Sequence, residues 1–426
     1  MQEKLLQFIW QYSLYNPSQL QTTNGEPITV VHPGRYNTNA GPDFLEAKVR
    51  VGDTLLAGHV ELHVNNSDWL KHGHQHDEAY RNVILHVVYN HDSDTGPAHT
   101  PVLELRNYIM PNVVQQYNAL MAQVQPIPCA SQLQQVKDIT KESWLTRILA
   151  ERWEEKQALW QELLDKSAGD WRNVLYWRMA SNFGFKLNAD VFLDLALSIP
   201  HNVFAKGGTL LQVEAVLFGQ AGMLDADFTD EYPNTLKKEY QYLKQKYQLT
   251  PLPAHRWKYL RLRPANFPTI RIAQFAALVH KSFHLFSQIV ETNTVKEVTQ
   301  LLDVTASDYW DTHYKFDEPS DTQAPKHLGK SSIQNIIINT IAPIRYLYAQ
   351  AHGTDKQQEL ALQLLDELPA EKNHIIEEYN TIGWKAINAA QGQAFIQLYN
   401  NYCSKKRCLE CAVGLSLLKS PPNKAD

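Results

Sequence analysis

Residues 54–64 read TLLAGHVELHV, and apolar and polar side chains alternate along the second half of this run. Successive side chains of a β-strand point to opposite faces of the sheet. One face of the predicted strand therefore carries Val60, Leu62 and Val64, and the other carries His59, Glu61 and His63. Three side chains of the metal-ligand type at positions i, i+2 and i+4 would converge on one surface. The pattern predicts a strand that supports an acid and histidine cluster.

The segments around this strand predict a small domain that mixes helix and sheet. Residues 2–14 have apolar positions at helical spacing, which predicts a first helix. The Gly52-Asp53 pair lies between two alternating runs and predicts a hairpin turn. Further strands are predicted at 27–32, 43–51, 83–90 and 102–107, with a short helical turn between 64 and 83. This order of elements indicates an α+β or α/β arrangement.

After about residue 112 the pattern changes to long amphipathic stretches, which predict a mostly α-helical region. These stretches are 134–166, 171–186, 189–199, 208–221, 233–247, 271–291, 294–303, 331–351, 356–367 and 370–400. The prolines of Pro126-Ile127-Pro128 favour an extended connection. We therefore predict an α+β protein with a mixed-sheet domain at 1–125, a helical domain at 126–400 and a Cys-rich tail at 401–426.

Composition limits the classes of function. The chain has 426 residues and a formal net charge of −5, so it is not a basic protein that coats nucleic acid, and any contact with DNA or RNA requires a local patch. The N-terminus, MQEKLLQFIWQY, lacks the basic region and the cleavage site of a signal peptide. No run is long and apolar enough to span a bilayer. We expect a cytoplasmic location and no membrane partner.

The acid and histidine cluster has the composition of a divalent-metal site. Carboxylates hold a hard cation, and the cation polarises a phosphate or a bound water. We predict Asp43, Glu61 and His63 as catalytic residues, and Asp43, Glu61 and His59 as ligands of Mg or Mn. Histidine ligands would shift the preference towards Mn, Zn or Fe. The alternative is a polar cluster whose members are satisfied by hydrogen bonds at a sheet edge.

The remaining histidines of this region have simpler interpretations. His72, His74 and His76 lie in a polar segment and are interpreted as exposed loop histidines. His86 lies inside the apolar run VILHVV and is interpreted as a buried, hydrogen-bonded histidine.

The order of these elements resembles the PD-(D/E)xK nuclease core, in which a strand bearing Asp is followed by a hairpin partner bearing (D/E)-x-K. Asp43 stands at the first motif, and Glu61-Leu62-His63 stands at the second. The resemblance implies a nuclease of the restriction-endonuclease-like fold, with Glu3 as the extra acid that some members carry. The chain departs from the pattern at His63, which occupies the lysine position.

Three of the four cysteines lie near the C-terminus with the spacing C-x4-C-x2-C, at Cys403, Cys408 and Cys411, and the fourth is Cys129. Thiolates at such spacing fit a tetrahedral zinc ion or an iron–sulfur cluster. The arrangement resembles the iron–sulfur clasp of some RecB-like exonucleases. Free, buried cysteines are the alternative. We expect a structural role, because four protein ligands leave no open coordination position.

Residues 255–271, HRWKYLRLRPANFPTIR, carry basic side chains without an acid, and aromatic residues lie between them. Arginine and aromatic side chains together suit phosphates and unstacked bases. The predicted nucleic-acid contacts are Arg256, Lys258, Arg261, Arg263 and Arg271. The alternative is a helix end whose arginines pair with buried acids.

Longer motifs resemble a bacterial family called domain of unknown function 2851. They are Asn39 to Phe44, Gly58 to His63, Ser67 to His74, Val83 to Val88, Val213 to Gly222, Arg261 to Pro268 and the cysteine tail. The family implies no established activity. The residues favour a metal-dependent nuclease-like phosphodiesterase acting on DNA or RNA. The alternatives are a non-enzymatic nucleic-acid or protein-binding factor with a degenerate nuclease core, and a hydrolase of small phosphorylated metabolites.

Overall fold

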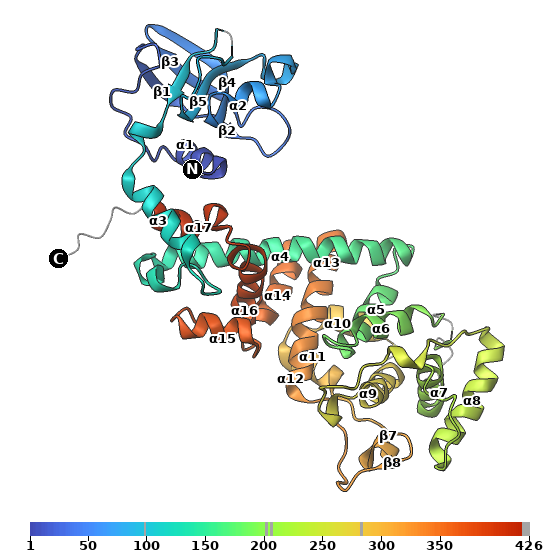
Figure 1. Ribbon diagram of the computed structural model, residues 1–426. Helices are drawn as coiled ribbons and strands as arrows, with labels where there is room; N and C mark the ends of the chain where they lie inside the picture. The colour runs from blue at the N-terminus through green and yellow to red at the C-terminus, as the bar shows by residue number, and fades with distance from the viewer. Residues whose placement is uncertain (98, 201–202, 205–207, 282–283, 420–426) are drawn as a thin grey trace. The chain divides into compact units, whose positions relative to one another are not determined.

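The structure is a computed structural model that describes residues 1–97, 99–200, 203–204, 208–281 and 284–419 (Figure 1). The chain folds into two compact units. Unit 1 comprises Met1–Leu145 and Leu398–Asp426, and unit 2 comprises Thr146–Gln397. The α+β class predicted from the sequence is confirmed. The domain limits predicted from the sequence, 1–125, 126–400 and 401–426, are not tested by this division and remain a prediction.

Unit 1 contains one mixed sheet. Its strands are β1 (Ile28–His32), β2 (Arg35–Tyr36), β3 (Phe44–Val51), β4 (Thr54–Asn65), β5 (Val83–Asn90) and β6 (Val102–Glu104). The strand order is β1-β3-β4-β5-β6, and β2 pairs with β3. Antiparallel pairing joins β1 to β3 and β3 to β4, whereas β4, β5 and β6 run parallel. The predicted hairpin is present, because Val51 pairs with Thr54 across a turn in which Gly52 has a φ of 55°.

The helices of unit 1 come from both ends of the chain. Its first part carries α1 (Glu3–Gln11), α2 (Asp68–Lys71), η1 (His74–His76), η2 (Glu78–Tyr80), η3 (Arg106–Tyr108), α3 (Pro111–Ala122) and η4 (Ala130–Gln135). Its C-terminal part carries η10 (Tyr399–Cys403), η11 (Cys408–Glu410) and α17 (Ala412–Lys419). The apolar face of α1 is buried, and α1 packs on β4. That packing places α1 beside the strand with the acid and histidine cluster.

α4 (Asp138–Lys166) contains the boundary between the two units. The other elements of unit 2 are α5 (Trp171–Phe183), α6 (Ala189–Leu197), α7 (Leu210–Gln220), α8 (Glu231–Tyr247), η6 (Ala254–Arg256), η7 (Pro264–Asn266), α9 (Pro268–Lys281), α10 (Leu285–Glu291), α11 (Val295–Leu302), η8 (Asp308–Asp311), β7 (His313–Lys315), β8 (Glu318–Pro319), α12 (Lys330–Ile336), η9 (Ile337–Ile341), α13 (Ala342–His352), α14 (Asp355–Asp366), α15 (His374–Thr381) and α16 (Ala389–Leu398).

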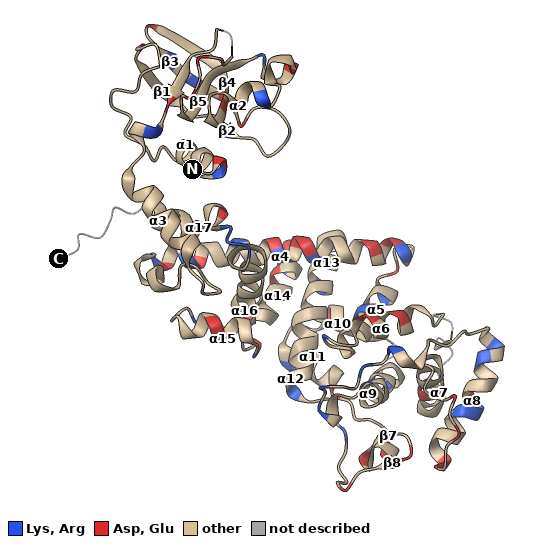
Figure 2. Cartoon of the chain, in the orientation of Figure 1, with Lys and Arg blue, Asp and Glu red and all other residues tan. Residues whose placement is uncertain are grey.

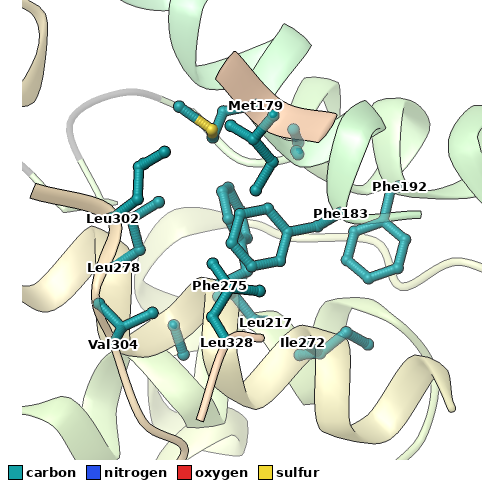
Figure 3. Close-up of a cluster of buried hydrophobic side chains, with 14 of the residues drawn as sticks. Met179, Phe183, Phe192, Leu217, Ile272, Phe275, Leu278, Leu302, Val304 and Leu328 are labelled. Carbon is teal, nitrogen blue, oxygen red and sulfur yellow. The ribbon is translucent and has the colours of Figure 1, made fainter. Parts of the chain in front are cut away.

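The core of unit 2 is apolar and rich in aromatic side chains. Figure 3 shows Phe183 of α5, Phe192 of α6 and Phe275 of α9 among the aliphatic side chains of neighbouring helices. All three phenylalanines are fully or almost fully buried. The rings of Phe183 and Phe275 meet with centroids 5.2 Å apart, in a tilted arrangement that aromatic pairs favour. Burial of these apolar faces is the main physical reason that the helices of unit 2 assemble.

Most of the predicted helices and strands are present, but some have other limits. The predicted helix 370–400 is divided into α15 and α16, and residues 382–388 between them are not helical. Two further differences have local causes. The predicted strand 102–107 ends at Glu104, and a 3-10 turn follows. The predicted helix 331–351 is interrupted by the π-helical turn η9, just before Pro343. Proline has no backbone N–H to donate, so the regular i to i−4 ladder cannot continue through it. No helix in the described ranges is long and apolar enough to cross a bilayer.

Candidate metal centre

A loop held by Asn37 positions Asp43 at the start of β3. The backbone N–H of Asn37 donates to the carbonyl of Asp43 over 2.8 Å, and its side-chain amide donates to the carbonyl of Pro42 over 3.0 Å. Gly41 has a φ of 104°, a conformation that glycine adopts without a steric cost. The loop therefore turns sharply and presents Asp43 to the neighbouring strand.

Two hydrogen bonds of opposite direction join Asp43 to Glu61 and Leu62, neighbouring residues of β4. The backbone N–H of Asp43 donates to Glu61 Oε2 over 3.0 Å. The backbone N–H of Leu62 donates to Asp43 Oδ2 over 3.0 Å. A third donor, Gln7 Nε2 of α1, reaches Asp43 Oδ1 over 2.8 Å, and the Tyr36 hydroxyl donates to the amide oxygen of Gln7. The two carboxylates are thereby fixed beside one another.

The environment of the two acids disfavours their charged forms. Burial, followed by the charge of Asp43, raises the pKa of Glu61 to about 9. Burial raises the pKa of Asp43 to about 6, against the opposing effect of its hydrogen bonds to Leu62 and Gln7. Within the described part of the chain, neither acid forms a salt bridge with a lysine or an arginine. A divalent cation is the kind of partner that would stabilise both carboxylates in the ionised form.

Three imidazoles complete the cluster. His63 Nε2 lies 3.6 Å from Glu61 Oε1, and His74 Nε2 lies 3.5 Å from the same oxygen. His63 Nε2 also contacts His72 Nδ1 at 3.1 Å, and His63 Nδ1 contacts His86 Nε2 at 2.9 Å. One potential ligand atom each from His63, His72 and His74 can be chosen so that all three lie within 4.8 Å of one another.

The segment between β4 and β5 brings His72 and His74 back over His63. Gly73 between them has a φ of 75°, and this left-handed conformation turns the chain at the end of α2. Trp69 of α2 is buried, and its ring packs against His74 and His86 with centroids 5.4 and 5.2 Å apart. Tyr80 stacks on His74 at 3.8 Å. These aromatic contacts fix the loop that carries two of the three imidazoles.

The residues present fit a divalent ion that accepts nitrogen and oxygen ligands. Burial and the neighbouring imidazoles lower the pKa of His63 to about 3, and burial lowers the pKa of His74. Both rings are therefore neutral at physiological pH, which is the form that binds a metal. His74 Nε2 is buried and has no hydrogen-bond partner. Such an unsatisfied nitrogen beside a carboxylate oxygen is suited to coordination.

His59, predicted as a ligand, does not belong to the three-histidine group. The pairing of β4 with β5 shifts register between His59 and Val60, because β5 has one extra residue, Ile84, at this point. The Nδ1 atom of His59 instead accepts the backbone N–H of Glu46 over 3.4 Å. Asp43, Glu61 and His63 are brought together, as the sequence predicted.

His72 and His74 were interpreted as exposed loop histidines, and the structure places both of them against His63. His72 is exposed, as expected, and its ring forms the solvent side of the cluster. His76 is exposed and outside the group. His86 is buried and contacts His63, as interpreted from the sequence. The signal in the sequence was the glycine of His72-Gly73-His74, which permits a turn that brings both rings to one side.

Residues 255–271, the basic segment of unit 2, contain side chains that pair within the protein and others that are exposed. Arg256 pairs with Asp194 of α6. Arg271 is buried and donates to Gln274 and Ser332 over 2.9 and 3.1 Å. The exposed members are Lys258, Arg261 and Arg263. Figure 2 shows basic residues on α4 and α8 as well, together with acidic residues. Positive charge is therefore not confined to residues 255–271.

The four cysteines, Cys129, Cys403, Cys408 and Cys411, are all buried in unit 1, and none forms a disulfide.

A family model described as "Protein of unknown function (DUF2851)" matches residues 3–374, which include the whole acid and histidine cluster but not the three C-terminal cysteines. No curated protein matches the chain. No solved structure matches it either.

Proposed function

We propose that this chain, which belongs to the DUF2851 family of proteins of unknown function, is a metal-dependent phosphodiesterase that cleaves DNA or RNA. The observation that carries the proposal is a pair of hydrogen bonds, from the N–H of Asp43 to Glu61 and from the N–H of Leu62 to Asp43. They fix the two acids side by side, next to His63 and His74. Glu61 is buried and faces the neutral imidazoles of His63 and His74, and the partly buried Asp43 lies beside it. Such a group is a ligand set for one divalent cation.

The metal ligands in this proposal are the three histidines whose ligand atoms lie within 4.8 Å of one another, His63, His72 and His74. Glu61 is the fourth, because its Oε1 atom lies 3.6 Å from Nε2 of His63 and 3.5 Å from Nε2 of His74. A divalent cation held there would polarise a phosphate oxygen and lower the pKa of a bound water. The three nitrogens favour Mn or Zn over Mg, because Mg prefers oxygen ligands and water. Asp43 lies at the edge of this set and keeps its carboxylate in place through Gln7 and the N–H of Leu62.

The role of Asp43 follows from its intermediate pKa. With a pKa of about 6, its carboxylate is mostly ionised at neutral pH and still able to take up a proton at Oδ1 or Oδ2. Glu61 differs, because its pKa of about 9 keeps it protonated until a cation replaces the proton. We propose that Glu61 binds the ion and that Asp43 orients or accepts protons beside it.

His63 occupies the position at which the PD-(D/E)xK pattern has lysine, and it acts differently here. Its side chain is only 1% exposed and contacts His72 and His86 through its two ring nitrogens. A neutral ring in this position cannot supply the positive charge of a lysine. The proposal therefore makes His63 a metal ligand, and positive charge at the reacting phosphate comes from the cation.

The order of elements around the site supports the same proposal. α1 precedes β3, the hairpin partner β4 carries Glu61, and α2 with its following turns leads to the parallel strand β5. This is the order that the resemblance to the PD-(D/E)xK core implies. The exposed side chains of Lys258, Arg261 and Arg263 are the proposed contacts to the nucleic-acid backbone.

The second candidate is a non-enzymatic binding factor with a degenerate nuclease core. The observation that favours it is the neutral, buried His63 in the lysine position. Such a protein would bind nucleic acid in a salt-dependent way without cleaving it. Both candidates therefore bind nucleic acid, but only the first candidate cleaves it.

The test is cleavage of labelled single- and double-stranded DNA and RNA with added Mn²⁺, Zn²⁺ or Mg²⁺. We expect wild-type protein to cleave at least one substrate with Mn²⁺, and Glu61→Gln to lose at least about 100-fold in rate. Asp53→Asn is the matched control, because Asp53 is exposed in the hairpin turn that leads into β4. Salt-dependent binding without cleavage by any of the three ions would favour the second candidate.

A further inference from the structure

The four cysteines of unit 1 occupy the ends of short structural elements. Cys129 immediately precedes η4, and Cys403 is the last residue of η10. Cys408 begins η11, and Cys411 follows that turn and precedes α17. All four side chains are buried, and the chain has no other cysteine. Every thiol of the protein is therefore located in this part of unit 1.

Packing within unit 1 brings the C-terminal cysteines to Cys129. α17 contacts both α3 and η4, the turn that follows Cys129. Lys406, in the loop between Cys403 and Cys408, donates to the carbonyls of Met121 and Gln123 over 2.7 and 3.0 Å. These contacts anchor the loop at the end of α3, a few residues before Cys129. Cys129 and Cys403 are more than 270 residues apart in the sequence.

The thiols are close enough to influence one another. Burial raises the pKa of Cys129, and the three C-terminal thiols, Cys403 first, raise it further. Burial raises the pKa of Cys411, whereas the backbone N–H groups of Gly414 and Val413 lower it. Four buried thiols near one another, with N–H donors directed at one of them, resemble the surroundings of thiolate ligands to a metal.

The distances between the sulfur atoms distinguish a site for one zinc ion from a site for an iron–sulfur cluster. One zinc ion bound by four thiolates at about 2.3 Å holds the sulfurs about 3.8 Å apart, by tetrahedral geometry. Among the described residues, no three cysteines bring their Sγ atoms within 4.8 Å of one another, although the three histidines of the other site satisfy that limit. A cubane cluster binds each thiolate to a different iron and so requires a wider arrangement.

We infer that Cys129, Cys403, Cys408 and Cys411 bind a 4Fe–4S cluster, with one thiolate on each iron. The cluster joins the C-terminal segment of unit 1 to the turn that follows α3. Four protein ligands occupy all four irons, so the cluster has a structural role and offers no site to a substrate. This inference is independent of the proposed function, because it concerns different residues from the acid and histidine cluster.

Gly414 provides a variant that leaves every thiol in place. A Cβ atom at this position of α17 would lie 2.0 Å from the backbone carbonyl oxygen of Cys408, a distance that forces the backbone to move. We therefore expect Gly414→Ala to displace Cys408 and weaken the cluster. Lys405→Ala is the matched control, because Lys405 is exposed in the loop between Cys403 and Cys408.

The experiment is anaerobic purification of the full chain, followed by analysis of iron, acid-labile sulfide and zinc and by visible absorption spectroscopy. We expect about four irons and four sulfides per chain, as the cluster type requires, with a broad charge-transfer absorption that dithionite bleaches. One zinc ion per chain in place of iron, retained in His74→Ala and therefore not held by the histidine site, would overturn the inference. Four titratable thiols without metal in protein as purified would overturn it as well.

The variants test whether these four cysteines hold the cluster. Cys408→Ser and Gly414→Ala should each lose at least half of the bound iron, whereas Lys405→Ala should keep the wild-type amount. If Cys408→Ser does not fold, the iron content of wild type and of Gly414→Ala still shows whether these cysteines hold the cluster. Full iron content in both Cys408→Ser and Gly414→Ala would place the iron elsewhere and contradict the assignment.

Discussion

The backbone N–H of Asp43 donates to Oε2 of Glu61 over 3.0 Å, so the loop before β3 and the middle of β4 are joined through the side chain of a buried acid. The bond from the N–H of Leu62 to Asp43 Oδ2 completes the exchange. Glu61 therefore accepts from the backbone just before β3, and Asp43 accepts from the backbone of β4. The position of the two carboxylates therefore depends on the register of the hairpin, and the side chain of Gln7 adds one further contact to Asp43.

The affinity for Mn²⁺ should increase with pH because Glu61 must release its proton when it binds the ion. Its pKa of about 9 in the free protein keeps it protonated at pH 7. Below that pKa, displacement of one proton strengthens binding roughly tenfold for each pH unit. Titration calorimetry in buffers of different ionisation enthalpy should detect at least one proton released at pH 7. A pH-independent affinity between pH 6 and 8 would contradict this role for Glu61.

His74→Ala should weaken Mn²⁺ binding roughly 10- to 100-fold, because it removes a nitrogen that lies 3.5 Å from Glu61 Oε1. His76→Ala is a matched control, since His76 belongs to the same turn, η1, but is exposed and outside the group of three histidines. Binding can be followed by electron paramagnetic resonance of free Mn²⁺. Equal affinities in the two variants would exclude His74 as a ligand.

His63→Lys should destabilise the protein and abolish metal binding, although it recreates the (D/E)-x-K sequence. The side chain of His63 is 1% exposed and is surrounded by His72, His74 and His86. A lysine charge buried there without a full ion pair costs on the order of 3 kcal/mol in unfolding free energy. Thermal unfolding and nuclease assays should both show the loss. Increased Mn²⁺-dependent cleavage by this variant would contradict the prediction. It would show that a lysine at position 63 is catalytic and that His63 is not a required metal ligand.

Glu214 of α7 should make the stability of unit 2 depend on pH. Burial raises its pKa from 4.5 to about 7, and Ser307 donates to Glu214 Oε1 over 2.6 Å. Because the folded state binds the proton more tightly, this contribution to stability is fully present below pH 4.5 and is lost as pH rises through about 7. The shift corresponds to about 3 kcal/mol.

Glu214→Gln should therefore be more stable than wild type above pH 7, by an amount that shrinks towards pH 4.5. Glutamine keeps an acceptor oxygen for Ser307 and removes the buried charge. Glu359→Gln is the control, because Glu359 is exposed on α14. Denaturant unfolding at several pH values measures the difference. The same pH dependence in wild type and Glu214→Gln would show that another group is responsible.

Much of the fold and part of the site follow from local patterns. The alternation in β4 and the turn at Gly52 were sufficient to predict the hairpin that brings Glu61 to Asp43. The helical spacing of residues 2–14 predicted α1, which contributes Gln7 to the site. These features depend on periodicity and turn chemistry, which the sequence displays directly.

Other parts depend on packing that no local pattern contains. His59 lies where one residue is inserted into β5, and its Nδ1 atom accepts the backbone N–H of Glu46, so this side chain stays outside the group of three histidines. His72 and His74 reach His63 only because Trp69 and Tyr80 hold their loop. Arg271 is buried because Ser332, distant in sequence, accepts its hydrogen bond. Each of these positions is determined by residues that become neighbours only in the folded chain.

The most direct test of the metal site is an anomalous difference map from crystals grown with Mn²⁺. Data collected between the absorption edges of manganese and iron would distinguish this ion from iron held by the cysteines. We expect one strong peak within bonding distance of Glu61, His63 and His74. A map without a peak there, in crystals whose Mn²⁺ occupies another site, would contradict the account.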